Sequence, residues 1–291
     1  MSRSPFPSKV TVPDRVRWSS VLAFLLERFP TIDAGVWQER LQSGVVTTAE
    51  GLPLKAESPV FPGMRIHYYR EVAHEEKIPF EEAVLYEDEH LVVACKPHFL
   101  PVIPSGRFVR ETLLTRLQMR LGEPDLTPVN RIDRETAGLV LFSRKKETRG
   151  LYQSLFMNRQ VEKVYEALSE SCPEGPGPFV VENRLIKGEP WFRMKEETGE
   201  INAVSRIEKV ETQGADTLFR VAPLTGKKHQ IRLHMCRIGA PIKYDPFYPE
   251  LKEQAPDDFT SPLKLLSKEL RFKDPRTGQM RHFISKRTLF S

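Results

Sequence analysis

The chain has 291 residues, 40% of them hydrophobic and 29% charged, which suits one large domain or two of ordinary size and excludes a chain that is disordered over most of its length. Its apolar runs reach only about six residues, against the roughly 20 of a membrane-spanning helix, which excludes a transmembrane protein. The formal net charge is +5, but the last 71 residues carry 14 basic and 7 acidic side chains, so a polyanion is a candidate partner and an ordinary basic surface is an equally good explanation.

The first part of the chain predicts a small unit of two helices and a short sheet. Residues 1–14 are polar and contain several prolines, so we expect a loose leader, and the lack of an apolar signal segment there favours a cytoplasmic protein. Apolar side chains then recur at helical spacing as far as Phe29, with Ser19 or Ser20 as the N-cap and Pro30 as the stop. The expected elements are helices over 16–29 and 33–42, strands over 45–48 and 64–69, and a linker over 74–79.

The rest of the chain predicts a larger unit in which helices and strands are mixed. The apolar run from Leu91 to Cys95 is typical of a buried strand, and a row of leucines from Leu113 to Leu121 indicates a helix that ends at Gly122. Because no regular βαβα alternation follows, we expect an α+β domain with a mixed, largely antiparallel sheet. Further strands are expected over 139–142, 163–168, 206–210 and 218–221, further helices near 151–156 and 231–238, and domains over residues 1–75 and 80–291.

The cysteines and histidines form no pattern that suits a metal or a disulfide. Cys95, Cys172 and Cys236 lie far apart without a Cys-x-x-Cys pair, so we expect three buried, reduced thiols. The chain also lacks a glycine-rich phosphate loop, a Gly-x-Ser-x-Gly elbow and a His-Glu-x-x-His pair. Metal, nucleotide and acyl-transfer chemistry are therefore less favoured.

One loop carries a candidate reactive group. Residues 128–138 precede an apolar strand, and within them Asp133 lies between Arg131 and Arg134. Either arginine would favour the ionised carboxylate that a nucleophile or base requires. The same pattern also fits an aspartate in a surface turn with an exposed ion pair, and spacing alone favours this second interpretation.

Five segments together resemble the RluA family of pseudouridine synthases. Asn130-Arg131-Ile132-Asp133, followed by Thr136 and Gly138, is similar to the family's His-Arg-Leu-Asp motif. The other segments occur in family order within residues 84–285, which makes a chance match improbable. They are residues 91–102 with Lys96-Pro97, residues 163–167 (Lys-Val-Tyr-Glu-Ala), residues 224–234 (Leu-Thr-Gly-Lys-Lys-His-Gln-Ile-Arg-Leu-His), and the group Gly239, Pro241, Ile242 and Asp245.

The resemblance implies an isomerase that acts on RNA without a cofactor or a metal. Members of the family break the N1–C1′ bond of a uridine, turn the base and rejoin it through C5, after the base has left its stack. The resemblance implies that Asp133 is the essential carboxylate at C1′ and that Arg232 pairs with it through a bidentate guanidinium. It also implies that Tyr165 stacks on the uracil and takes part in the proton transfer at C5.

Three further residues are implied to bind the RNA. Arg131 matches the arginine that fills the vacated space in the RNA stack, and Leu233 matches part of the apolar wall of the pocket. His229 lies three positions before Arg232 on the expected helix and so shares its face.

The sequence departs from the family pattern at several positions. Asn130 replaces the usual histidine, Ala137 the usual serine and Tyr244 a common glycine. The departures leave the carboxylate, the tyrosine and the arginine in place, so they bear on the identity of the substrate more than on activity. The remaining departures are Lys227-Lys228 for Arg-Thr and Ala240 for a common histidine.

The N-terminal unit resembles, more weakly, the small helical RNA-binding module that often precedes this catalytic domain. Residues 40–46 read like its helix-to-strand turn and residues 62–66 like its closing strand, but its Val-Asn-Gly turn is missing. Residues 1–75 are therefore either a degenerate RNA-binding module or a structural cap.

Two other functions compete with a synthase. One is a catalytically inactive RNA-binding protein that keeps the fold, against which the joint presence of Asp133, Tyr165 and Arg232 argues. The other is a nuclease or hydrolase, which would need an acidic cluster or paired histidines that the chain lacks. The expected partner is ribosomal or transfer RNA, with no membrane and no DNA, and the expected state is a monomer.

Overall fold

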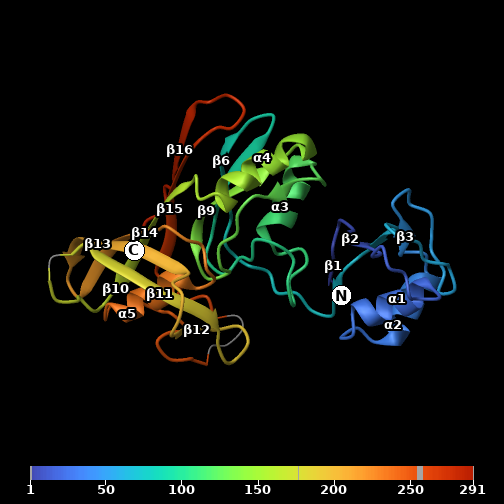
Figure 1. Cartoon of the computed structure of the whole chain (residues 1–291), viewed down its shortest axis with the longest axis horizontal. Coiled ribbons are helices and arrows are strands. Elements are labelled where there is room, and N and C mark those ends of the chain that lie inside the picture. Colours follow the sequence, from blue (N-terminus) through green and yellow to red (C-terminus); the bar gives the residue numbers. More distant parts are fainter. Residues whose placement is uncertain (1, 176, 254–257, 291) are drawn as a thin grey trace. The chain divides into compact units, whose positions relative to one another are not determined.

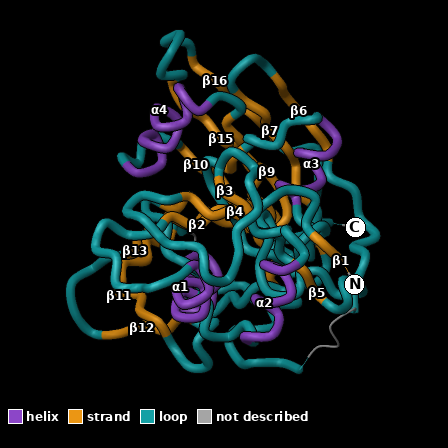
Figure 2. The backbone as a smooth tube through the Cα atoms, turned by 90° about the vertical axis from the view of Figure 1, so that its right-hand side faces the viewer, coloured by secondary structure: helices purple, strands orange, loops and turns teal. Residues whose placement is uncertain are grey.

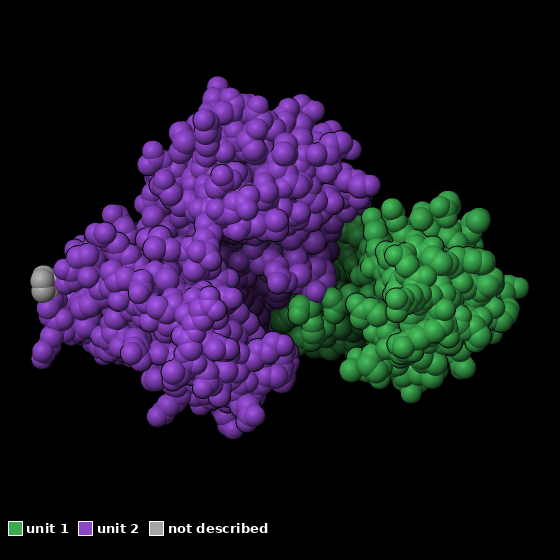
Figure 3. All heavy atoms as spheres, viewed as in Figure 1, with its two compact units in different colours: residues 1–75, 105–110 green, residues 76–104, 111–291 purple. Residues whose placement is uncertain are grey.

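The computed structural model describes residues 2–175, 177–253 and 258–290, and the chain divides into two compact units (Figure 3). Unit 1 comprises residues 1–75 and 105–110, and unit 2 comprises residues 76–104 and 111–291. The short segment 105–110 interrupts the expected second domain because Glu75 binds it: one carboxylate oxygen accepts from the backbone N–H groups of Val109 and Arg110, at 2.6 and 2.7 Å.

Unit 1 packs two helices onto a small sheet. Ser20 and Asp33 cap α1 (Val21–Arg28) and α2 (Ala34–Gln42) by accepting from backbone N–H groups of the first turns, as the sequence predicted for α1. The sheet has the order β2-β4-β3, and a separate pair joins β1 to β5. Trp37, Phe24 and Ile66 are the large buried side chains between the layers. The strands are β1 (Ser2–Arg3), β2 (Ser8–Thr11), β3 (Thr47–Thr48), β4 (Arg65–Tyr68) and β5 (Glu71–Val72).

The expectation of a loose leader over residues 1–14 is wrong. Strand β2 pairs antiparallel with β4, and Val10 and Val12 are buried in the core of unit 1. Two alternating valines were enough to anchor the segment, although its prolines suggested an irregular chain.

Unit 2 is built on one large sheet (Figures 1 and 2). Within the described residues the sheet has 11 strands, nine of which follow the order β12-β11-β13-β14-β10-β15-β9-β7-β6, while β16 pairs with β15 and β8 with β9. Only β9 and β15 pair in parallel among the described strands, which confirms the α+β class with a largely antiparallel sheet. The strands are β6 (Ala83–Glu87), β7 (Leu91–Lys96), β8 (Thr127–Pro128), β9 (Ala137–Ser143), β10 (Glu162–Ser169), β11 (Phe179–Lys187), β12 (Met194–Glu197), β13 (Ala203–Gln213), β14 (Asp216–Pro223), β15 (Leu265–Lys273) and β16 (Met280–Ile284).

The two faces of the sheet carry different cores. Helix α5 (Gln230–Arg237) packs Ile231 and Met235 against one face, together with Ala167 and Phe219. Leu168 and Leu218, which adjoin Ala167 and Phe219 in the sequence, point to the opposite face. There they pack with Leu266 and with Leu289 near the C-terminus. Helices α3 (Leu113–Leu121) and α4 (Lys146–Met157) belong to the half of the unit around β6, β7 and β9. None of the helices in the described part of the chain is long and apolar enough to cross a membrane.

Gly138 allows β9 and β15 to approach each other. Its φ is +113°, and a Cβ atom there would lie 2.2 Å from the carbonyl oxygen of Ser267, closer than any side chain permits. The parallel register places Gly138 opposite Ser267, immediately after the loop that carries Asp133. This glycine therefore lets β15 lie directly against the start of β9.

The expected burial of all three cysteines is only partly right. Cys95 is buried, Cys236 is half-buried and Cys172 is exposed, and all three are free thiols. Cys172 follows the end of β10 in a loop, where no sheet neighbour covers it.

Candidate active site

The loop that carries Asp133 is fastened to the sheet on both sides. The side-chain oxygen of Asn130 accepts from the backbone N–H of Leu141 at 2.8 Å. Lys96, at the end of β7, donates from Nζ to the carbonyl of Arg134 at 2.9 Å, and His98 donates from Nδ1 to the carbonyl of Glu135 at 2.7 Å. Asn130, which stands where the family usually has histidine, thus serves as a local anchor of the loop.

Arg232 lies at the centre of the site and is held by a second aspartate. Its Nε donates to Asp245 Oδ2 at 2.8 Å and its Nη2 to Asp245 Oδ1, and both side chains are 1% exposed. The backbone N–H groups of Phe247 and Tyr248 also donate to Asp245 Oδ1. Burial disfavours the guanidinium cation, but the hydrogen bond and charge of Asp245 outweigh it and raise the pKa of Arg232. The expected bidentate partner, Asp133, is therefore not the one observed.

The remaining guanidinium nitrogen of Arg232 faces the candidate carboxylate. Nη1 is buried without a hydrogen-bond partner among the described residues and lies 3.8 Å from Asp133 Oδ2 and 4.0 Å from Glu135 Oε2. The side chain of Asp133 is 28% exposed. Burial raises the pKa of Asp133, while the charges of Arg232, Lys228 and Lys96 oppose that rise. The site thus holds one partly accessible carboxylate beside an available charged donor.

His229 is the second group beside the carboxylate. Its Nε2 lies 3.8 Å from Asp133 Oδ2 and its Nδ1 lies 2.9 Å from the hydroxyl of Tyr248. The residue is the N-cap of α5 and has a left-handed backbone, with φ of +54°. Burial, with the nearby charges of Arg232 and Lys228, lowers the pKa of His229 to about 3, so the imidazole is neutral near pH 7.

Tyr165 lies on the same face of the sheet as α5. It packs against the core cluster of Ala167 and Ile231, and it is paired across the strands with Ser267, to which its hydroxyl is hydrogen-bonded. Burial raises the pKa of Tyr165 to about 12, and the charge of Asp133 adds to the effect. The hydroxyl therefore keeps its proton near neutral pH.

Lys96 is a buried cation under the loop. Its side chain is fully buried, and its Nζ donates to the carbonyls of Pro97 and Arg134, both at 2.9 Å. Burial lowers the pKa of Lys96 to about 7, although the charges of Glu135 and Asp133 oppose the shift. In the sequence, Lys96 stands out only as part of a Lys-Pro pair, and no role was predicted for it.

The residues implied to bind RNA are distributed around this centre. Arg131 is exposed and makes no hydrogen bond or ion pair with the described residues, Leu233 is half-buried on α5, and His229 is 6% exposed. The structure therefore brings Asp133, Arg232 and His229 together and leaves Arg131 at the surface of the loop.

A row of aromatic side chains that was not predicted from the sequence leads from the site to solvent. Ring centroids are 5.6 Å apart between His229 and Phe247, 5.2 Å between Phe247 and Phe192, and 5.9 Å between Phe192 and Trp191. Trp191 is 82% exposed, and Lys228 Nζ lies 6.0 Å from its ring centroid. The sequence feature that could have indicated this surface is the dipeptide Trp191-Phe192 within a polar turn, because large aromatic side chains are usually buried.

The hairpin that carries Trp191 is tied to the site. The hydroxyl of Tyr248, which contacts His229, accepts from the backbone N–H of Met194 at 2.7 Å and donates to its carbonyl at 3.2 Å. Arg193 donates to the carbonyl of Pro249 at 3.0 Å. The turn between β11 and β12 is therefore held beside Arg232 and His229.

Comparison with known proteins shows the family to which the chain belongs. The family model described as RNA pseudouridylate synthase matches residues 90–236. That match covers half of the chain and contains Asp133, Tyr165 and Arg232. The chain belongs to the RNA pseudouridylate synthase family.

Individual relatives identify the branch of this family. The chain is 32% identical over 209 residues to a dual-specificity RNA pseudouridine synthase RluA of Vibrio cholerae, covering 68% of this chain and 80% of the relative. It is 29% identical over 254 residues to a ribosomal large subunit pseudouridine synthase D of Xylella fastidiosa, covering 84% and 75%. The chain is thus an RluA-type pseudouridine synthase, and members of this family are isomerases.

A solved structure shows the same fold. The human RNA pseudouridylate synthase domain containing 4 superimposes with a TM-score of 0.55 at 24% identity, over 70% of this chain and 87% of that structure. At this identity the likeness concerns the pseudouridylate synthase fold alone.

Proposed function

We propose that this synthase converts specific uridines to pseudouridine in structured ribosomal or transfer RNA, with Asp133 as its essential catalytic residue. The names of the relatives support an RNA target, since one is described as acting on the large ribosomal subunit and another as a dual-specificity RNA enzyme. The cytoplasm is the proposed location and a monomer the proposed state, as the sequence led us to expect.

One observation carries the proposal. A partly accessible carboxylate, Asp133, lies 3.8 Å from a guanidinium nitrogen of Arg232 that has no hydrogen-bond partner among the described residues. Because Asp245 occupies the other side of Arg232, this donor is held in place before any substrate arrives. The charge of Arg232 opposes the rise in the pKa of Asp133 that burial causes, and so favours the ionised carboxylate.

The reaction requires three changes at the flipped uridine. The N1–C1′ bond breaks while Asp133 acts at C1′ or next to it, the base turns, and C5 forms the new bond to C1′. The proton on C5 is then lost and N1 gains a proton, so that atoms balance without a cofactor. In this proposal Tyr165 stacks on the uracil, and its hydroxyl, which is protonated near neutral pH, acts in the transfer at C5 as a relay that passes its own proton on as it accepts the proton from C5.

The surrounding residues are proposed to hold the RNA. Arg131, free of partners among the described residues, fills the space that the extruded base leaves, and Leu233 forms the apolar wall. His229, neutral and buried, contacts the target nucleotide by hydrogen bonding rather than by charge. Trp191, beside Lys228, is a stacking surface for a neighbouring base.

We propose that unit 1 contributes to RNA recognition. The support is the weak resemblance of residues 40–46 and 62–66 to a small RNA-binding module, together with an independent hydrophobic core. A structural cap is the competing explanation.

The test is the variant Asp133→Asn. Because the change is nearly isosteric and removes only the negative charge, we expect isomerisation to fall below detection while RNA binding and the melting temperature stay near those of the unaltered protein. Pseudouridine mapping of RNA from cells that lack the protein, complemented with each variant, reports the target and the loss together. Glu147→Gln, an exposed carboxylate on α4, is the matched control.

Two results would contradict the proposal. Substantial turnover by Asp133→Asn would remove Asp133 from the catalytic role. An unaltered protein that binds RNA tightly but leaves every uridine unchanged would favour the inactive RNA-binding protein.

A further inference from the structure

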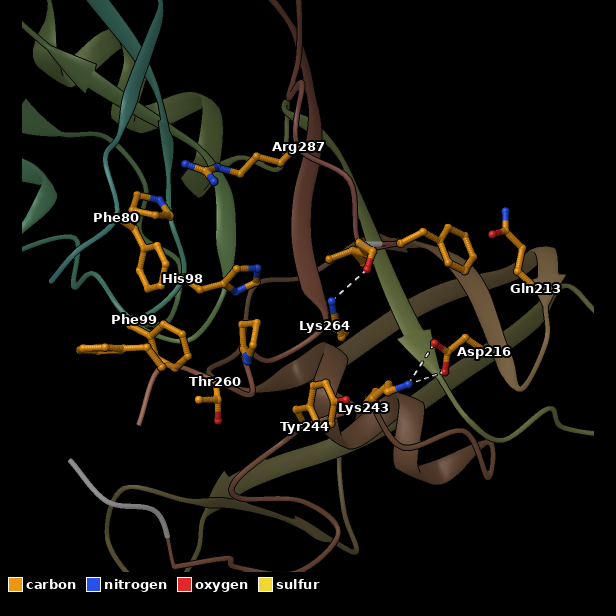
Figure 4. A pocket seen from close by; sticks show the side chains of 15 residues that line it. Phe80, His98, Phe99, Gln213, Asp216, Lys243, Tyr244, Thr260, Lys264 and Arg287 are labelled. Carbon is orange, nitrogen blue, oxygen red and sulfur yellow. Dashed lines mark hydrogen bonds and ion pairs between the residues drawn. The ribbon is translucent and has the colours of Figure 1, made fainter. Parts of the chain in front are cut away.

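A cavity lies on the face of the sheet opposite the catalytic residues. Its volume is about 820 Å³, and Figure 4 shows the side chains that line it. One lining residue, Leu289, packs with Leu168, Leu218 and Leu266 on the face away from α5. Tyr165 and Ala167 belong to the α5 face. Side chains three residues apart in a strand point to opposite faces, so Tyr165, beside the catalytic site, and Leu168, beside Leu289, lie on opposite sides of β10. The cavity is therefore separate from the site around Asp133.

Aromatic rings form much of the lining. The rings of Phe80, Phe99 and Phe259 contact one another, with centroids 5.2 to 6.0 Å apart. Tyr244 lines the cavity as well and is 40% exposed. In Figure 4 Phe80 and Phe99 lie at one end, Asp216 and Gln213 at the other, and Tyr244 with Lys264 between them. The cavity therefore offers flat apolar surfaces to a ligand beside polar groups.

Two of these aromatic residues have strained backbones. Phe99 and Tyr244 have φ angles of +64° and +61°, in the left-handed region that bulky residues rarely adopt. Only two other non-glycine residues in the described part of the chain do so, and one of them, His229, lies in the catalytic site. Tyr244 also stands where the family commonly has glycine, which would be free of this strain. Backbone strain kept at a residue whose side chain is 40% exposed indicates that the ring has a use.

Cations accompany the rings. Lys243, Lys264 and Arg287 line the cavity with a single carboxylate, Asp216, which is bound to Lys243 Nζ at 2.9 Å. Lys264 Nζ donates to the carbonyl of Leu289, and Arg287 Nη2 to that of Glu81, while Arg287 Nε is buried without a partner among the described residues. Burial lowers the pKa of His98, also in the lining, to about 4, so it adds no charge. The lining thus has an excess of two positive charges.

We propose that this cavity binds a nucleotide, whose base stacks on Tyr244 or the phenylalanine cluster and whose phosphate meets Lys264 and Arg287. Flat rings next to cations are the combination that single-stranded nucleotides require. The volume lies within the usual range for small-ligand sites. The nucleotide belongs either to the RNA substrate, a source that rests on the proposed function, or to a free mononucleotide.

The cavity is joined to the catalytic site through the backbone. His98, in its lining, holds the carbonyl of Glu135, two residues after Asp133. Tyr244 immediately precedes Asp245, which holds Arg232. A nucleotide in the cavity therefore contacts both segments that position the catalytic pair.

The experiment uses the full chain with Asp133→Asn, so that the readout does not depend on turnover. A hexauridylate in which one base is 4-thiouridine is irradiated with the protein, and the cross-linked peptides are identified by mass spectrometry. We expect cross-links to the peptides that contain Tyr244 or Phe259. Competition with uridine 5′-monophosphate and with unlabelled hexauridylate separates the sources: a free nucleotide is indicated if the monophosphate competes at the lower concentration, and a strand of RNA if the hexamer does.

Variants of Tyr244 decide whether its ring binds or merely packs. Tyr244→Gly should lower the cross-linking yield at the Phe259 peptide about ten-fold, the scale of one lost base stack, while the melting temperature stays equal or rises because the strain is relieved. Tyr244→Phe should keep the yield. Arg271→Gln, an exposed arginine of β15 that lies outside the cavity lining, is the control and should change nothing.

The outcomes separate this site from the proposed function. No cross-link at the cavity, or an unchanged yield with Tyr244→Gly, would overturn the site even if the unaltered protein makes pseudouridine. A cross-link that responds to Tyr244→Gly would support the site even if no uridine were isomerised.

Discussion

At the scale of single residues, the site consists of two aspartates that share one arginine unequally. Asp245 takes two of the guanidinium nitrogens of Arg232 and receives two backbone N–H groups as well, so its hydrogen-bonding capacity is used within the fold. Asp133 lies near the third nitrogen and stays partly accessible. The family resemblance implied a bidentate contact between Arg232 and Asp133, whereas the structure gives that contact to Asp245, which lies 13 residues from Arg232 in the sequence.

Trp191 offers a test of RNA recognition at this scale. Because its ring is almost fully exposed and packs little of the core, we expect Trp191→Ala to leave the melting temperature within about 1 °C, as surface substitutions usually do, and to weaken RNA binding about ten-fold through one lost base stack. Fluorescence titration with a labelled stem-loop measures the affinity. Met157→Ala, at an exposed position on α4, is the control. Equal affinities for the two variants would remove Trp191 from the RNA surface.

At the scale of elements, helices were easier to predict than the sheet. Gly122 ends α3 where the sequence predicted, and Ser20, which caps α1, is one of the two serines that the sequence offered for that position. Strand β15 was missed, although it is central, because the charged residues within its sequence hide the alternation of buried side chains. Its neighbours β9 and β10 come from much earlier in the chain, and a local sequence pattern cannot show which distant strands pair with each other.

The end of β7 gives a prediction with a defined dependence on pH. Burial lowers the pKa of Lys96 from 10.5 to about 7, so the unfolded chain binds the extra proton between these values and the folded protein gains stability as the pH rises through this window. The full cost of burying the cation is present below pH 7. We expect the difference in unfolding free energy between the unaltered protein and Lys96→Met to move in favour of the unaltered protein by about 1.4 kcal/mol per pH unit from pH 7 to pH 9.

Denaturant titrations at several pH values measure this difference. Lys146→Met, an exposed lysine on α4, should show no such trend. Parallel stability curves for the unaltered protein and Lys96→Met would mean that Lys96 keeps its proton inside the fold.

At the scale of the whole molecule, the chain comprises two compact units, and the boundary is less simple than the sequence suggested. Residues 105–110 belong to unit 1, although they lie within the sequence of unit 2. Phe108 and Val109 in this segment are buried. The charged composition near residue 75 indicated a linker there. A segment of six residues that joins unit 1 is too short to change the local composition detectably, so the sequence did not indicate it.

The role of unit 1 is tested by deletion. In a chain that lacks residues 1–75, we replace residues 106–109 by Gly-Ser-Gly-Ser to remove the apolar pair Phe108-Val109, which the deletion would expose. We expect this chain to fold and to isomerise a short stem-loop while it binds the full RNA more weakly. Thermal melting and pseudouridine assays on both RNAs measure this. Early melting or insolubility would indicate a structural cap, and unchanged affinity for the full RNA would assign unit 1 to another partner.

The close approach of Gly138 and Ser267 also determines when the site forms during synthesis. The hydroxyl of Ser267 donates to the carbonyl of Leu139, across 128 residues of chain, and β9 has no β15 partner until the ribosome has released both segments. The nascent protein therefore exposes an unpaired edge beside the Asp133 loop while residues 144–264 are synthesised. We expect the catalytic loop to be ordered among the last events of folding, so that released, incomplete chains contain every proposed catalytic residue and yet have no working site.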